Sequence, residues 1–248
     1  MGDSHKPLII GHRGAGVLAP ENTMAAVNVA FEMNLDAVEL DIRASADQIL
    51  VLCHDETLPR TTKGTGEISK WSVEDLKKLD AGAWFDPSYQ KEPIPILHEI
   101  LPYFPNRLIA FLELKDIDHA EPFGALISGH EAESWCVALS FADQILQHIT
   151  SLYPKLKRAF IHHPKADVAD LMNRVTSLPA DLIGFFPIHM VPENVEPCRE
   201  AGLQILTGPI NDVETLNRVL PLIPDYILSD RPDIIRSALY PDTEKCHL

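Results

Sequence analysis

The feature that most constrains the fold is an alternation of short β-rich runs with helical segments along almost the whole chain. Helical periodicity predicts helices over 21–34, 142–152, 167–175, 193–201 and 212–220. Strands that alternate with helices are typical of a parallel sheet with crossover helices. Nine runs are predicted to be strands: 8–12, 37–42, 49–54, 108–114, 135–140, 159–162, 182–186, 203–206 and 226–228.

Two of these nine runs lie too close together for a crossover helix. The third run begins at Ile49, soon after the second ends at Ile42, so it must return antiparallel as a hairpin. Eight parallel strands then remain, the number that closes a (β/α)8 TIM barrel of about 250 residues. We therefore predict an α/β fold in which residues 1–248 form one barrel domain with a small insertion after the second strand.

Composition limits the classes of function. The chain carries a formal charge of -15 and shows no basic stripe, which argues against nucleic acid as a partner. No apolar run approaches the roughly 20 residues of a membrane-spanning helix, and the N-terminus lacks the pattern of a signal peptide, so we expect no membrane span and a cytoplasmic location. An anionic substrate would need local positive charge or a bound cation.

The predicted hairpin gathers polar side chains at the end of the second strand. Glu39 and Asp41 are two residues apart and therefore share a face of that strand. If the turn centres on Asp47 and Gln48, Asp41 lies directly opposite His54, and opposed side chains share a face. Carboxyl ends of barrel strands are where barrel chemistry is placed, so the three side chains are candidate site residues.

The next strand repeats this pattern, with Glu113 and Lys115 on one face at the end of an apolar run. Three carboxylates, Glu39, Asp41 and Glu113, would then face one mouth and repel one another. Hard oxygen ligands in this arrangement suit Mg²⁺ or Ca²⁺.

The first strand ends in His12 and Arg13, beside the acidic pair of the second strand. Arginine can hold a phosphate with its bidentate fork, and histidine is suited to move a proton near neutral pH. With His54 as a second histidine, the group fits cleavage of a phosphodiester, in which one residue deprotonates the attacking oxygen and another protonates the departing alcohol.

The motifs HRG…PENT, ELD, HDETLPRTTKGTG, LKKLDAGAWF, PIPILHEIL, FLELK, SF and SDRP follow in order across residues 11–232. In these motifs the chain resembles the glycerophosphodiester phosphodiesterase family. The resemblance implies a (β/α)8 barrel, a divalent cation, and hydrolysis of small glycerophosphodiesters to sn-glycerol 3-phosphate and an alcohol. It also implies that residues 56–92 form a small insertion capping the barrel, after which a helix near residues 97–103 resumes the barrel.

The resemblance further implies a role for each candidate residue. The acid/base pair is His12 and His54, the metal ligands are Glu39, Asp41 and Glu113, and the phosphate contacts are Arg13 and Lys115. One departure concerns the segment LTGPIND, where the family commonly has a Trp-Thr pair and this chain has Gly208 and Pro209. That exchange predicts the loss of an aromatic wall from the mouth.

Two other functions remain open at this level. One is a phospholipase D-like phosphodiesterase of the sphingomyelinase D type, which shares the two histidines and the carboxylates; short mouth loops and an intact insertion favour the glycerophosphodiesterase. The other is a non-catalytic phosphoglycerol-binding module, which would be expected to have lost a histidine or a carboxylate. None is missing here. Head-group specificity, the choice between Mg²⁺ and Ca²⁺, and the oligomeric state are left open.

Overall fold

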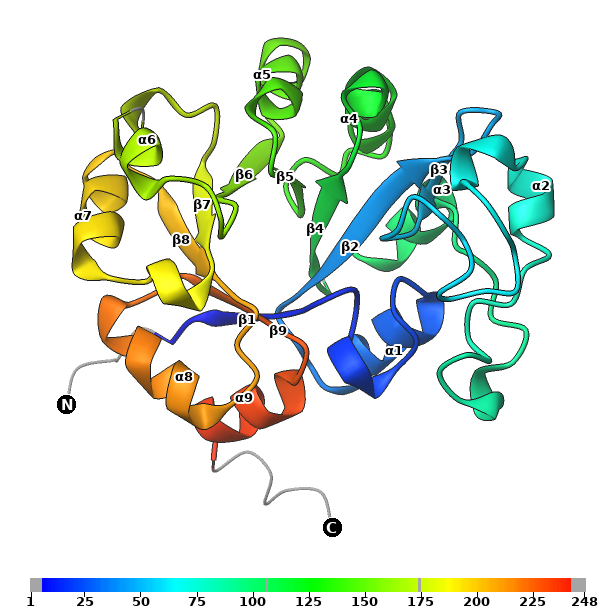
Figure 1. The fold of residues 1–248 in the computed structure, drawn as a ribbon, viewed down its shortest axis with the longest axis horizontal. Helices are drawn as coiled ribbons and strands as arrows, with labels where there is room; N and C mark the ends of the chain where they lie inside the picture. Colours follow the sequence, from blue (N-terminus) through cyan, green and yellow to red (C-terminus); the bar gives the residue numbers. More distant parts are fainter. Residues whose placement is uncertain (1–5, 106, 174, 242–248) are drawn as a thin grey trace.

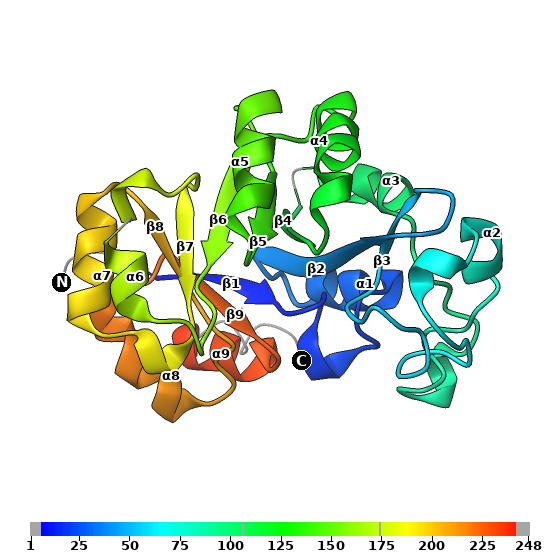
Figure 2. The same ribbon diagram turned by 45° about the horizontal axis from the view of Figure 1, so that its top comes forward.

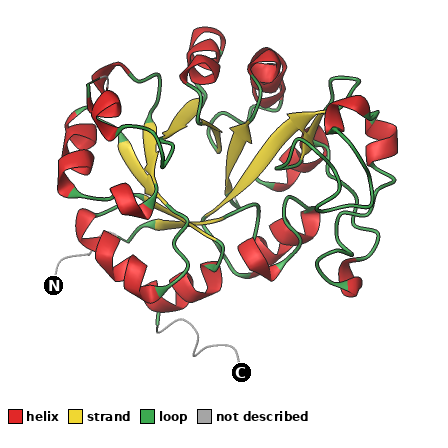
Figure 3. Cartoon of the chain, in the orientation of Figure 1, coloured by secondary structure: helices red, strands yellow, loops and turns green. Residues whose placement is uncertain are grey.

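A computed structural model describes residues 6–105, 107–173 and 175–241 of the chain. Eight parallel strands form a closed barrel in the order β1-β9-β8-β7-β6-β5-β4-β2, and β1 also pairs with β2 (Figure 1; Figure 3). The predicted (β/α)8 barrel is confirmed. The barrel strands are β1 (Leu8–Gly11), β2 (Ala37–Ala44), β4 (Ile109–Leu114), β5 (Cys136–Ser140), β6 (Lys157–Ile161), β7 (Leu182–Phe185), β8 (Gln204–Thr207) and β9 (Tyr226–Ser229).

Helices surround the barrel and cover its outer face (Figure 1). The five helices expected from the periodicity are α1, α5, α6, α7 and α8, although α1 and α6 are shorter than predicted. No helix among the described residues is long and apolar enough to cross a membrane. The helices are α1 (Met24–Glu32), α2 (Val73–Leu76), α3 (Leu97–Ile100), α4 (Ala120–Gly129), α5 (Asp143–Leu152), α6 (Val168–Met172), α7 (Pro192–Glu200), α8 (Val213–Val219) and α9 (Pro232–Leu239).

Two apolar layers hold the barrel together, because successive strand residues point alternately inward and outward. The outer layer packs strand residues against the helices and includes Leu40, Leu112 and Ile183. The inner layer fills the barrel and contains Ile10, Ala37, Phe111, Val137, Leu139, Ala159, Ile161, Leu182, Leu206 and Tyr226.

The hairpin forms, but its register differs from the prediction by one residue. β3 (Leu50–Leu52) runs antiparallel to β2 with Ile42 opposite Leu52. The backbone N–H of Cys53 donates to the carbonyl of Asp41 at 3.0 Å, so Cys53 and not His54 lies opposite Asp41. His54 follows the end of the strand and still borders the central cavity.

The turn explains this correction. The prediction assumed a two-residue turn, whereas the N–H of Ser45 donates to the carbonyl of Ile49 at 3.0 Å and encloses three residues. Gln48, the last of the three, has a φ of 62°, which is the left-handed conformation found at that position of three-residue hairpin loops. One extra turn residue shifts every cross-strand pair by one position.

Residues 56–92 lie on the outer side of β2 and β3 and contain α2 (Figure 2). They pack on the hairpin through a small apolar cluster that joins Val51 of β3 to Leu58 and Leu76. The chain then returns to the barrel through α3, followed by a 3₁₀ turn at Leu101–Tyr103, as the family resemblance implied.

Candidate active site

A strained turn after β1 presents His12 and Arg13 at the mouth of the barrel. Arg13 has a φ of 53°, which is uncommon for a residue with a side chain, and Gly14 follows with a φ of 105°. A Cβ on Gly14 would lie 2.6 Å from the Cβ of Ala26 in α1, so only glycine fits there. The N–H of Asn22 donates to the carbonyl of Arg13 at 2.9 Å and closes the turn.

Two neighbouring strands bring three carboxylates together. β2 supplies Glu39 and Asp41, β4 supplies Glu113, and the parallel register sets Asp41 beside Glu113. One oxygen from each carboxylate lies within 4.8 Å of the other two. Glu39 and Asp41 are 3% and 1% exposed, so the group is withdrawn from water.

Lys115 supplies positive charge to this acidic cluster. Its Nζ lies 2.6 Å from Oδ1 of Asp41 and 2.6 Å from Oε1 of Glu113. Burial alone would lower the pKa of Lys115, but the two carboxylates outweigh burial and raise it. For the acid Asp41, burial alone would raise the pKa, yet Lys115 and other partners hold the pKa of Asp41 below its usual range. For Glu113, the effect of burial exceeds that of Lys115, so the pKa of Glu113 is raised.

Glu39 is the least neutralised member of the cluster. Its Oε2 accepts the backbone N–H of Arg13 at 3.0 Å, but its buried Oε1 has no hydrogen-bond partner. Burial, followed by repulsion from Asp41, raises the pKa of Glu39 to about 8. This oxygen and the two neighbouring carboxylates form a set of ligands that suits a hard divalent cation.

His12 is held by a carboxylate from the opposite end of the chain. Its Nδ1 lies 2.6 Å from Oδ1 of Asp230, whose Oδ2 accepts from Nδ2 of Asn211 at 2.9 Å. Burial would lower the pKa of His12, but the hydrogen bond to Asp230 and the charge of Glu39 raise it overall. Nε2 of His12 lies 3.8 Å from Oε2 of Glu39, so this nitrogen faces the acidic cluster.

His54 has a similar carboxylate partner. Its Nδ1 lies 2.7 Å from Oδ1 of Asp55, and Nε of Arg60 donates to the second oxygen of Asp55 at 2.5 Å. The hydrogen bond from Arg60 is the main reason why the pKa of Asp55 falls to about 2. Burial lowers the pKa of His54 despite the nearby charge of Asp41. Each histidine therefore uses Nδ1 for an aspartate and leaves Nε2 available.

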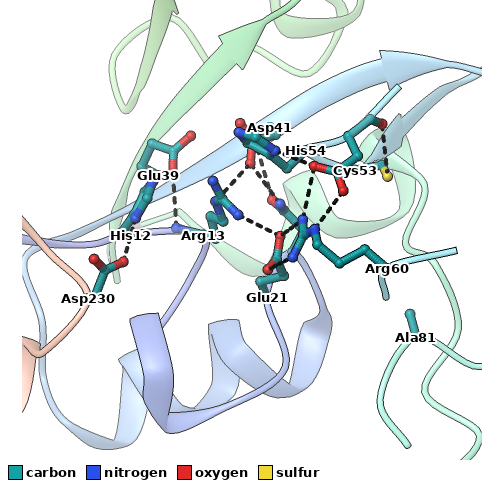
Figure 4. A network of polar contacts seen from close by, with 12 residues as sticks. His12, Arg13, Glu21, Glu39, Asp41, Cys53, His54, Arg60, Ala81 and Asp230 are labelled. Atoms are coloured by element: carbon teal, nitrogen blue, oxygen red, sulfur yellow. Dashed lines mark hydrogen bonds and ion pairs between the residues drawn. The ribbon is translucent and has the colours of Figure 1, made fainter. Parts of the chain in front are cut away.

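Glu21 links the two histidine-bearing loops through arginines (Figure 4). It accepts from Nη1 of Arg13 at 2.9 Å and from Nη1 of Arg60 at 2.6 Å. Burial would raise the pKa of Glu21, but the two arginines lower it. Glu21 does not cap the following helix, because Thr23 takes that role by accepting the N–H of Ala26 at 3.2 Å.

Six of the residues described above border one cavity of about 270 Å³ at the carboxyl ends of the strands. A Cβ on Gly208 would lie 2.5 Å from the carbonyl oxygen of Leu228, so this backbone leaves no room for a side chain there. The charged side of the cavity contains His12, Arg13, Glu39, His54, Glu113 and Lys115. The opposite side is apolar and contains Leu139, Phe141, Ile161, Phe186, Leu206 and Leu228, together with Gly208 and Pro209.

Five residues of the site were not singled out from the sequence: Asn22, Asp55, Arg60, Asn211 and Asp230. Asn22 clasps Asp41, donating from Nδ2 to Oδ2 at 2.8 Å and accepting the backbone N–H of Asp41 at 2.9 Å. Four of them lie inside the motifs PENT, HDETLPR and SDRP, whereas Asn211 lies in LTGPIND, the segment where the chain departs from the family pattern.

Comparisons with known proteins agree with this geometry. The sequence profile of the Glycerophosphoryl diester phosphodiesterase family matches residues 12–234. A glycerophosphodiester phosphodiesterase of Caldanaerobacter subterraneus is 29% identical over 236 residues, which cover 93% of this chain and 96% of that protein.

Solved structures give the same result. A glycerophosphodiester phosphodiesterase from Agrobacterium tumefaciens is 32% identical, with a TM-score of 0.83 over 94% of this chain and 100% of that one. An Oleispira antarctica phosphodiesterase, solved in complex with the product sn-glycerol-3-phosphate, is 30% identical, with a TM-score of 0.84 over 94% of this chain and 96% of that one. This chain therefore belongs to the glycerophosphoryl diester phosphodiesterase family.

Proposed function

We propose that the protein hydrolyses glycerophosphodiesters to sn-glycerol 3-phosphate and an alcohol, with a divalent cation and two histidines. The observation that carries the proposal is that two histidines, each held by an aspartate, line one cavity together with members of a cluster of three carboxylates. Further support comes from the Oleispira antarctica relative, whose structure contains sn-glycerol-3-phosphate as product. The proposal includes a single barrel domain into which residues 56–92 are inserted.

In this proposal Glu39, Asp41 and Glu113 hold the cation, which is Mg²⁺ or Ca²⁺. Oxygen-only ligands favour these hard ions over softer metals. When bound, the cation supplies Lewis-acid stabilisation of negative charge on the phosphate. The unpartnered Oε1 of Glu39 supports this assignment, because a buried acidic oxygen needs a positive partner.

The histidines move the two protons of the reaction. As the oxygen of water attacks phosphorus, Nε2 of one histidine accepts its proton. The bond from phosphorus to the leaving oxygen breaks, and Nε2 of the other histidine donates a proton to that oxygen, which leaves as the alcohol. Asp55 and Asp230 hold His54 and His12 through Nδ1 and so keep each Nε2 turned toward the reaction.

Arg13 and Lys115 are the proposed phosphate contacts. Both line the cavity beside the histidines, and both are cations in a strongly acidic chain. Lys115 neutralises Asp41 and Glu113 in the absence of a cation, so cation binding would free its ammonium group for the phosphate.

Hydrolysis of glycerophosphocholine, measured as release of sn-glycerol 3-phosphate with and without EDTA, tests the proposal. We expect turnover that EDTA removes and added Mg²⁺ or Ca²⁺ restores. Binding of sn-glycerol 3-phosphate without any turnover would identify a phosphoglycerol-binding module instead. Turnover of sphingomyelin or another choline-bearing lipid in place of glycerophosphocholine would identify a sphingomyelinase D-like enzyme.

A further inference from the structure

A second cavity, of about 390 Å³, lies on the other side of the catalytic residues. His12 and Arg13 line this cavity as well as the first one, so the two cavities meet at the proposed phosphate position. The other walls come from Val17 in the loop after β1 and from Trp84 and Phe85 in the inserted segment. The inserted segment thus contributes aromatic side chains next to the reaction centre.

The chemistry of a phosphodiester requires space on both sides of the phosphorus atom. One arm is the glycerol that remains in sn-glycerol 3-phosphate, and the other is the alcohol that leaves. Two cavities that share His12 and Arg13 provide one compartment for each arm. The inserted segment lines the second cavity and not the first, so whichever arm enters the second cavity comes within reach of Trp84.

The aromatic wall is fixed by backbone contacts. Nε1 of Trp84 donates to the carbonyl of Ala81 at 2.8 Å, and the ring of Trp84 meets that of Phe85 edge to face, with centroids 5.8 Å apart. Oδ1 of Asp80 accepts the N–H groups of Gly82 and of the next residue, each at 2.9 Å. Trp84 remains 43% exposed, so its indole has free surface for a ligand.

Two carboxylates stand beside the aromatic wall of this cavity, and each already has a basic partner. Glu21 and Asp230 both line it, and each is held in place by the network described above. Arg13 also borders the cavity, but its guanidinium is paired with Glu21 at 2.9 Å. The aromatic faces are what favours a cationic ligand, because proteins recognise quaternary ammonium groups through the faces of aromatic rings.

We propose that this second cavity binds the leaving alcohol and that Trp84 and Phe85 favour alcohols that carry a quaternary ammonium group, as choline does. The inference rests on the proposed hydrolase function and names the class of substrate that the enzyme prefers. Trp84 and Phe85 contact the part of the substrate that carries no reacting atom, so they determine specificity and take no part in proton transfer.

The test compares glycerophosphocholine with its 3,3-dimethylbutyl ester analogue, which has the same shape and no charge. The native enzyme should show a kcat/KM about three- to fivefold higher for the choline ester, the size of a cation–π contact at a half-exposed site. Trp84→Ala should lower kcat/KM for the choline ester to the level of the analogue, mainly through KM, and Trp84→Phe should retain most of the preference.

Two controls isolate the alcohol subsite. Tyr103→Ala removes an exposed aromatic ring that borders neither cavity. It should leave kcat/KM unchanged for both esters. Inhibition by sn-glycerol 3-phosphate should be the same in Trp84→Ala as in the native enzyme, because the product lacks the alcohol. Equal native kcat/KM values for the two esters, or an equal loss of both in Trp84→Ala, would overturn the proposal. Hydrolysis of neither ester by the native enzyme would instead refute the proposed function.

Discussion

The two sides of the barrel mouth differ sharply in chemistry. The charged side chains come from β2 and β4 and from the residues that directly follow β1, β3 and β4, whereas β5, β6 and β8 present Leu139, Ile161 and Leu206 to the same cavity. The apolar side continues the inner core of the barrel without interruption. The charged side carries a buried acid, Glu39, one oxygen of which has no hydrogen-bond partner. The comparison indicates that the strands of one side hold the shape while those of the other carry out the chemistry.

Removing the proposed divalent cation should give the largest effect, because it leaves the three buried carboxylates of the charged side incompletely neutralised. We expect chelation to abolish turnover and added cation to restore it. Cation should also raise the melting temperature, since a ligand that binds only the folded state stabilises it. Full activity in EDTA after exhaustive dialysis would show that the charged side works without a metal.

Replacing either histidine should give the next largest effect. His12→Ala and His54→Ala should each lower kcat by on the order of 10²-fold or more, the scale of general acid–base catalysis. Cation binding, measured by calorimetry, should persist in both variants, because neither histidine belongs to the carboxylate cluster. A variant that no longer bound the cation would identify its histidine as a ligand.

Some features of the fold and of the site can be predicted from the sequence, and others cannot. Strand alternation predicted the barrel, and the spacing of Glu39, Asp41 and Glu113 at strand ends predicted their convergence, because both depend on a period of two and on parallel register. The hairpin register depends on the backbone conformation of Gln48, which side-chain identity did not reveal. The pair of His12 and Asp230 joins residues 218 positions apart, and no local pattern reports such a contact.

Glu39→Gln should expose the cost of charge burial on the charged side. Without cation, the pKa of Glu39 is about 8 in the folded protein against an ordinary value of 4.5. Between these values the folded chain holds a proton that the unfolded chain has lost, so native stability falls as pH rises through this window and levels off above it. The carboxamide of the variant does not titrate, so the stability of the variant relative to the native protein should rise by on the order of 5 kcal/mol from the lower to the upper pH limit.

Urea denaturation in EDTA across this pH window measures the effect of Glu39→Gln. Glu67→Gln, at a more exposed carboxylate of the inserted segment, is the matched control. With saturating cation the native protein should be more stable than Glu39→Gln, because a carboxamide is a poorer ligand than a carboxylate. A difference between Glu39→Gln and the native protein that stayed constant with pH would mean that Glu39 is ionised in the folded chain.

Asp230→Asn and Asp55→Asn should give the smallest effects, and they compare the two histidine–aspartate pairs of the charged side. Asp230 is anchored by the neutral amide of Asn211, so its full negative charge acts on His12 and raises the pKa of that histidine. Asp55 is anchored by the cation of Arg60, which offsets its charge toward His54. The two aspartates should therefore differ in how strongly each one controls the pKa of its histidine.

The pH dependence of kcat in the two variants measures this difference. Asp230→Asn should lower the pKa of His12 and move one limb of the pH–rate profile to lower pH, with a loss of about tenfold in kcat, equivalent to about 1.4 kcal/mol. Asp55→Asn should shift its limb less, because Arg60 already cancels most of the charge that is removed. Equal shifts in the two variants would show that the anchors of the aspartates do not distinguish the histidines, and that the two pairs differ only in burial.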